Sequence, residues 1–135
     1  MSSSAANADT VLVAAPPLSA WMGTLIDYVQ SARPDLTNRQ MALLMVVYLL
    51  PGPHTVRGLA ARLRVSKPVV TRALNTLGSL GYLRRQKDDA DLRNIFIQQT
   101  PQGLAFLEAF AELIERTEGH DKHRERARER RQTAH

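Results

Sequence analysis

The strongest constraint on the fold is the stretch at residues 55–85, TVRGLAARLRVSKPVVTRALNTLGSLGYLRR, which is followed closely by DLRNIFI. Its apolar residues recur every three or four positions, which predicts two short helices joined by a tight turn through Arg64 and Val65. Residues 82–85 and 95–98 are strand-like and flank a polar link, which predicts a β-hairpin. The sequence therefore predicts the order helix, turn, helix and hairpin.

The second helix of this pair, expected over residues 66–80, has two different faces. Ser66 is a favourable N-cap, and Pro68 falls in the first turn, where proline loses no intrahelical hydrogen bond. Val70, Leu74 and Leu77 recur at helical spacing and are predicted to face the core. The residues left on the outer face are Lys67, Pro68, Thr71, Arg72 and Asn75.

This outer face carries residue types that recognise DNA bases. The major groove admits one α-helix, and its base edges are bound by arginine at guanine, asparagine at adenine and apolar groups at the thymine methyl. Ser66 and Lys67 lie at the helix N-terminus, which favours a phosphate oxygen. Polar outer faces are also common on helices that bind nothing, so the face alone leaves both interpretations open.

The predicted hairpin places positive charge beside this helix. Its basic residues are Arg84, Arg85, Lys87 and Arg93. A hairpin arginine can enter the minor groove, where it senses the width and negative potential of the groove. Asp91 lies two residues before Arg93, on the same side of an extended chain, so we expect it to pair with Arg93 and orient it. Asp88 and Asp89 are interpreted as solubilising loop residues.

From about residue 37 to residue 103, the chain resembles the MarR family of bacterial winged-helix transcription regulators. The matching pieces are the helix pair, Asp91-x-Arg93 and Thr100-x-x-Gly103. The resemblance implies a mainly α fold with a small β-hairpin, a winged helix-turn-helix of order α-α-α-α-β-β-α. It implies a homodimer on a pseudo-palindromic operator, with the helix over 66–80 in the major groove. The wing over 84–97, through Arg93, would enter the minor groove.

The sequence departs from the family pattern at two places. Gln99 stands where a leucine usually precedes the threonine, so we expect the wing to pack differently on the last helix. Family members usually have a further terminal helix for dimerisation, whereas this chain has the Arg/Glu-rich segment from Gly119 onward, which lacks an apolar stripe. We expect that segment to form a solvated, fraying helix with a modest attraction for nucleic acid.

Helices near both ends of the chain have apolar faces that a small core cannot cover. In the helix after Pro101, the predicted stripe is Leu104, Leu107, Phe110, Ala111 and Ile114, and Phe106 and Leu113 widen it. A partner chain is the expected cover, and the alternative is that the two terminal helices cover each other within one chain. The residues assigned to dimerisation are Leu18, Trp21, Met22, Leu25, Leu107, Phe110 and Ile114.

The domain organisation follows from these patterns. We expect a disordered Ser/Ala tail over residues 1–15, a winged-helix domain with terminal dimerisation helices over 16–118, and a charged tail over 119–135. The net charge of +5 and the pI of about 10.2 favour a polyanionic partner such as nucleic acid without identifying one. The histidines at 120 and 123 could share a helical face, but we expect no metal site.

Several classes of function are disfavoured. The chain has no cysteine, and it contains no nucleophile motif, phosphate loop or HExxH spacing, so we expect no enzymatic activity and no cofactor. The resemblance leaves a small-molecule effector open. The longest apolar run, residues 41–50, is about half a membrane span, so no membrane partner is expected. We expect a location in the bacterial cytoplasm, at the nucleoid. The alternative function is a winged-helix protein-interaction module without specific DNA binding.

Overall fold

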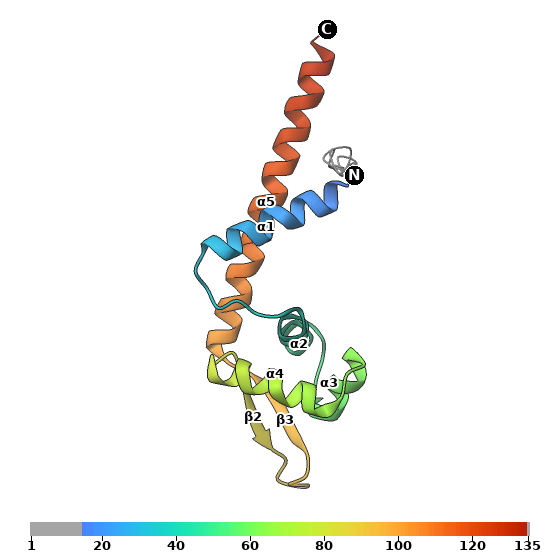
Figure 1. The fold of residues 1–135 in the computed structure, drawn as a ribbon, viewed down its shortest axis with the longest axis vertical. Helices are drawn as coiled ribbons and strands as arrows, with labels where there is room; N and C mark the ends of the chain where they lie inside the picture. The colour runs from blue at the N-terminus through green and yellow to red at the C-terminus, as the bar shows by residue number, and fades with distance from the viewer. Residues whose placement is uncertain (1–14, 135) are drawn as a thin grey trace, which may run out of the picture. The chain divides into compact units, whose positions relative to one another are not determined.

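The computed structural model describes residues 15–134, with residues 120–122 and 124 described by their backbone alone (Figure 1). The elements are α1 (Pro16–Gln30), α2 (Asn38–Leu49), β1 (His54–Thr55), α3 (Val56–Leu63), α4 (Lys67–Ser79), β2 (Leu83–Lys87), β3 (Ile95–Gln99) and α5 (Pro101–Thr133). They form two compact units. The winged unit is residues 33–112, and the terminal unit comprises the described residues up to 32 and from 113 onward. The tail expected over 1–15 falls almost entirely outside the described residues.

Side-chain caps determine where α2 and α3 begin. Thr37 accepts a hydrogen bond from the Gln40 N–H at 3.1 Å, and the Gln40 side chain accepts one from the Thr37 N–H at 2.9 Å. This reciprocal pair is a capping box, which satisfies donors that a helix start leaves unpaired. Thr55 caps α3 in the same way, since its hydroxyl accepts from the Gly58 N–H at 3.0 Å. Each of these two helices therefore begins just after a threonine whose hydroxyl caps it.

The core of the winged unit is built from the inner faces of α2, α3 and α4. The largest side chains with almost no exposure are Leu43, Leu44, Leu59, Leu77 and Val70. The predicted inward stripe of α4 is confirmed, because Val70, Leu74 and Leu77 are at most 2% exposed. At the end of α4 the chain turns at Gly81, whose φ of 78° is a conformation that favours glycine.

The sheet of the winged unit has three antiparallel strands in the order β1-β3-β2. β2 pairs with β3 along its whole length, with Leu83 opposite Gln99 and Lys87 opposite Ile95. β1 adds only two residues, of which His54 lies opposite Ile97. The hairpin was predicted from the sequence, and the third strand was not. A two-residue strand is too short to leave an alternating pattern.

The buried face of α5 includes part of the predicted apolar stripe. The buried residues are Gly103, Phe106, Phe110, Leu113 and Thr117. Leu104 and Ala111 belong to the predicted stripe and are exposed in the single chain, and their cover by a partner chain remains a prediction. Gly103, on the buried face, closely approaches the Tyr48 hydroxyl and the Tyr82 carbonyl oxygen, where a larger residue would collide. Phe106, on the same face, stacks on the Tyr82 ring with centroids 4.5 Å apart.

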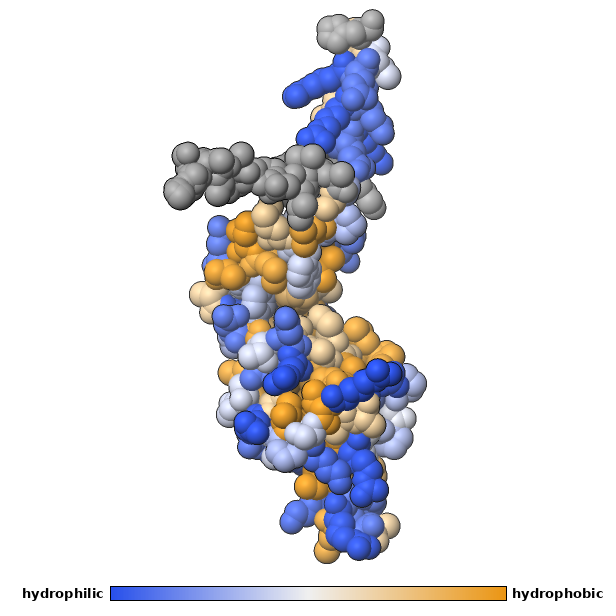
Figure 2. All heavy atoms as spheres, turned by 45° about the vertical axis from the view of Figure 1, so that its right-hand side comes forward, coloured by the Kyte–Doolittle hydropathy of each residue, from blue (hydrophilic) through white to orange (hydrophobic). Residues whose placement is uncertain are grey.

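α5 continues through the Arg/Glu-rich segment as part of one 33-residue helix. The described side chains from 125 to 134 are exposed, apart from the half-buried Ala127. The charged end of the chain is accordingly blue in Figure 2. The solvated helix expected in this segment is therefore present in the structure. Within residues 15–134, no helix is both long and apolar enough to cross a membrane.

In the terminal unit, α1 buries a stripe opposite to its apolar face. Thr24 and Tyr28 are buried, and a Cβ on Gly23 would lie 2.9 Å from Cγ2 of Thr117 in α5. The apolar face stays exposed, and Figure 2 shows hydrophobic residues at the surface of this unit. Its residues are Leu18, Trp21, Met22, Leu25, Ile26 and Val29, which are 41–71% exposed. The two terminal helices thus contact each other within the chain, and this contact leaves the apolar face of α1 exposed.

Candidate nucleic-acid interface

The outer face of α4 carries the residues that were predicted to recognise DNA. Ser66 caps the helix, since its hydroxyl accepts from the Val69 N–H at 3.4 Å. Every residue assigned to this face is exposed, namely Ser66, Lys67, Pro68, Thr71, Arg72 and Asn75. Their predicted positions are confirmed, and their contacts with DNA remain predictions. α4 thus offers a ridge of polar and small side chains on top of a fully buried apolar stripe.

Arg85 on β2 reaches from the wing back to this ridge. Its Nη2 donates to Oδ1 of Asn75 at 2.8 Å and to the carbonyl oxygen of Thr71 at 3.2 Å. The sequence predicted Arg85 as a DNA contact and did not reveal this bond to α4. One pattern could have indicated it. Arg85 lies two residues after the buried Leu83, so the two share the sheet face that meets the helix layer.

The other basic residues of β2 have different surroundings. Arg84 lies on the opposite face of the hairpin, where its Nε donates to Oε1 of Gln98 at 3.0 Å. These two residues are direct partners in the strand register. Lys87, at the end of β2, is exposed and makes no hydrogen bond or ion pair with any residue that the structure describes. Of the three, only Lys87 has a charged group without a protein partner within the described chain.

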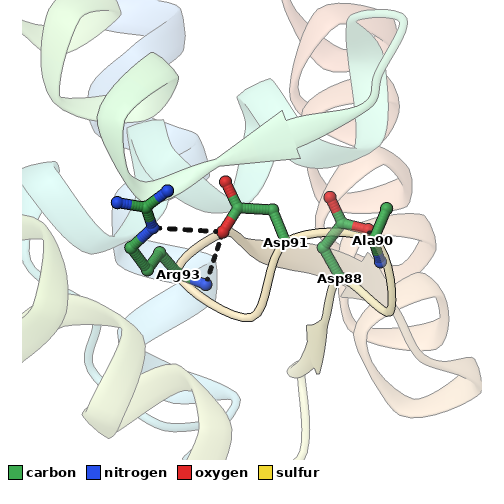
Figure 3. A network of polar contacts seen from close by, with 4 residues as sticks. All are labelled: Asp88, Ala90, Asp91 and Arg93. Atoms are coloured by element: carbon green, nitrogen blue, oxygen red, sulfur yellow. Dashed lines mark hydrogen bonds and ion pairs between the residues drawn. The ribbon is translucent and has the colours of Figure 1, made fainter.

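The tip of the wing contains the predicted Asp91–Arg93 pair (Figure 3). Oδ1 of Asp91 accepts from Nε of Arg93 at 3.3 Å and from the Arg93 backbone N–H at 3.1 Å. The Arg93 side chain is 93% exposed, so the pair contributes little to stability, and its effect is on side-chain direction. Asp88 does more than solubilise the loop, because its carboxylate accepts from the Ala90 N–H at 2.9 Å.

The residues assigned to dimerisation fall into two groups. Those on α1 are exposed: Leu18, Trp21, Met22 and Leu25. On α5, Leu107 and Ile114 are half-buried, and Phe110 is only 3% exposed. Phe110 therefore offers little surface to a partner chain. Ile26 and Val29 share the exposed face of α1 and were not assigned, although their spacing would have included them.

The described residues contain no cluster with the geometry of a metal site. Among the residues that the structure describes, no three His, Asp or Glu side chains gather as a metal site would require. The side chain of one member of the histidine pair in the tail, at position 120, lies outside the described residues. The His120–His123 pair is therefore not described.

Comparison with known proteins identifies the segment that contains α4 and most of the wing. Residues 35–93 match the sequence profile of the MarR family. The transcriptional regulator Tm0710 from Thermotoga maritima is 28% identical, with a TM-score of 0.60, over 73% of this chain and 67% of its own. Residues 35–93 thus form a segment that is similar to the MarR family. This MarR-family segment includes every residue assigned to DNA recognition, with Arg93 as its last residue.

The solved structures also confirm the fold. The complex of MepR from S. aureus with DNA is 20% identical, with a TM-score of 0.63, over 92% of this chain and 96% of its own. A mutant of MepR is 19% identical, with a TM-score of 0.68, over 93% of this chain and 98% of its own. The predicted winged helix-turn-helix is thus confirmed, with β1 as an additional strand. No curated protein sequence matches this chain significantly.

Proposed function

We propose that this protein is a homodimeric transcriptional regulator that binds a specific sequence in double-stranded DNA. The observation that carries the proposal is the placement of an exposed polar α4 and a basic wing on one compact unit, residues 33–112. The MarR-family segment supports it, since transcription regulation is what that family does. MepR, a structural relative, binds DNA in its crystal structure.

In the proposed complex, α4 lies in the major groove. Arg72 and Asn75 face the base edges, and Thr71 and Pro68 lie close enough to contact a thymine methyl. Ser66 and Lys67, at the helix N-terminus, bind a phosphate oxygen and fix the position of the helix. The exposure of all these residues in the free protein allows them to meet DNA without rearrangement of the core.

The wing follows the neighbouring minor groove. Arg93 is almost fully exposed at its tip and is held by Asp91, which favours an extended side chain that reaches into a narrow groove. Lys87, which lacks a protein partner within the described chain, is placed to bind the DNA backbone.

The proposal of a homodimer depends on the surface of the terminal unit. The exposed face of α1 contains six large hydrophobic residues, which is more apolar surface than scattered single residues would produce. A second copy of the chain would cover this face by two-fold symmetry. The two α4 helices would then lie about one duplex turn apart, roughly 34–36 Å, and would favour an inverted repeat.

The direct test is selection of bound duplexes from a random pool with the purified protein. An enriched inverted repeat is expected, and Arg72→Ala should lower its affinity relative to random duplex. Affinity should fall with salt, with a log–log slope of about −0.9 for each phosphate neutralised. Failure to enrich any sequence, together with no salt-dependent duplex binding, would overturn the proposal in favour of a protein-interaction module.

A further inference from the structure

The bond between Arg85 and Asn75 fixes the direction of an amide that is expected to face DNA bases. A guanidinium has only N–H donors and cannot accept a hydrogen bond. The atom of Asn75 that lies 2.8 Å from Nη2 of Arg85 is therefore the carbonyl Oδ1, not the amide nitrogen. Within the described residues, no other group binds the Asn75 amide. Its NH₂ group, on the other branch, is left available.

Both the guanidinium group and the backbone of Arg85 are held in place. Its Nη2 also donates to the carbonyl oxygen of Thr71, one helical turn before Asn75, so the guanidinium contacts two acceptors on α4. Its backbone lies in the paired part of β2, opposite Ile97, which is 4% exposed. β2 pairs with β3 along its whole length and begins at the buried Leu83. The backbone from which the Arg85 side chain extends is therefore held in a fixed position.

We propose that Arg85 is a positioning residue that makes Asn75 select guanine over adenine at one base pair of the operator. This proposal rests on the function proposed above. An asparagine binds adenine by donating to N7 and accepting from the N6 amino group, so it needs both branches of its amide. Arg85 occupies one lone pair of Oδ1 and lies against that oxygen, so the unbonded NH₂ group of Asn75 is the part of the amide left to face a base. Guanine offers two acceptors to these donors, N7 and O6. The adenine amino group would also meet the positive guanidinium beside Oδ1.

A simple phosphate contact by Arg85 makes a different prediction. A phosphate contact depends mainly on charge, so lysine would replace arginine with little change in sequence preference. A positioning role depends on the fixed fork of the guanidinium, which lysine lacks. Arg84 provides the matched control, because it is the adjacent residue on β2 and makes an equivalent guanidinium–amide bond to Gln98, away from α4.

The experiment compares duplex selection by the wild-type protein, Arg85→Lys, Arg85→Met and Arg84→Lys. The Asn75→Ala variant first identifies the base pair that Asn75 recognises, as the position where preference is lost. At that position the wild type is expected to favour guanine by about tenfold. Both Arg85 variants should reduce this ratio to near one or reverse it, while Arg85→Lys keeps most of its affinity for random duplex. Arg84→Lys should change binding to all duplexes alike and leave the ratio intact.

Three results would overturn the proposal. The wild type could prefer adenine at the position that depends on Asn75. Arg85→Lys could keep the wild-type preference at every position. Arg85→Met could weaken all duplexes equally and reduce the salt slope by about 0.9, as loss of a phosphate contact would. A fourth result is distinct from these three: the wild type could select no duplex at all. The proposed function would then be wrong, and the positioning role of Arg85 that depends on it would be wrong as well.

Discussion

The hydroxyl of Tyr48 accepts a hydrogen bond of 2.9 Å from the backbone N–H of Thr100, the residue before α5. Its own proton faces two carbonyl oxygens, that of Tyr82 at 2.8 Å and that of Thr100 at 3.1 Å. The Thr100 hydroxyl in turn donates to the carbonyl oxygen of Gly81 at 2.6 Å. A single side chain of α2 thus joins the turn after α4 to the start of α5.

Tyr48→Phe should destabilise the winged unit by about 1–3 kcal/mol, because it leaves part-buried backbone groups without a partner. Denaturation in urea would measure this as a lower midpoint. Tyr82→Phe is the matched control, since no described residue hydrogen-bonds the Tyr82 hydroxyl and its ring can still stack on Phe106. Burial raises the pKa of Tyr82, while Arg33 opposes that shift, so the control removes no charge at neutral pH. Equal midpoints for the two variants would contradict the prediction.

Gly103→Ala should destabilise the protein at least as much as Tyr48→Phe. A methyl group here would collide with the Tyr48 hydroxyl and the Tyr82 carbonyl oxygen, and overpacking of this kind costs about 1–3 kcal/mol or more. Gly119→Ala is the control in the same helix, because nothing lies within 4 Å of an added Cβ there. Alanine should be neutral or stabilising by about 0.5–1 kcal/mol at position 119. A stable Gly103→Ala protein would refute the close approach.

Asp91→Ala should weaken binding to the selected operator by about two- to fivefold, the range expected for an exposed ion pair. The direction of the change in DNA affinity distinguishes two effects of this substitution. Removing a negative charge near DNA would by itself strengthen binding, so weakening can only come from the loss of the contact with Arg93. Asp89→Ala removes the same charge from an exposed residue that accepts no hydrogen bond within the described chain, and it should bind slightly more tightly. Fluorescence anisotropy titrations would compare them, and tighter binding by both variants would disprove the orienting role.

Met22→Glu should weaken self-association by roughly tenfold or more, because a carboxylate would be buried without a partner in the proposed dimer contact. Met22 is 56% exposed in the single chain, so the substitution leaves the fold of the protomer intact. Gln102→Glu adds the same charge at an exposed position of α5 in the winged unit and should have little effect. Sedimentation equilibrium at several concentrations measures the association, and an unchanged dimer of Met22→Glu would exclude this face.

Local patterns predicted much of this molecule. The cap at Ser66 and the turn through Arg64 and Val65 each depend on residues within a few positions of one another. The two faces of α4 follow from helical spacing alone. Asp91 and Arg93 are also close in sequence, which is why their contact could be predicted.

The features that the sequence did not reveal depend on contacts between distant segments. Strand β1 exists only because two residues pair with β3 more than 40 positions later. The close approach of Gly103 to Tyr48 fixes the rotation of α5, so Phe106 and Phe110 are buried while Leu104 is exposed. Arg85 binds Asn75 across the turn between α4 and β2, and no periodicity records that contact.

The strand order β1-β3-β2 leaves β2 at an edge of the sheet, with one row of backbone groups unpaired within the sheet. An exposed edge strand is a template on which another copy can add and begin to aggregate. After Leu83, every residue of β2 is exposed, and three of those four carry positive charge. A second β2 strand brought alongside would place like charges next to one another. The wing that we propose for DNA therefore also protects the protein against edge-to-edge aggregation when no DNA is bound.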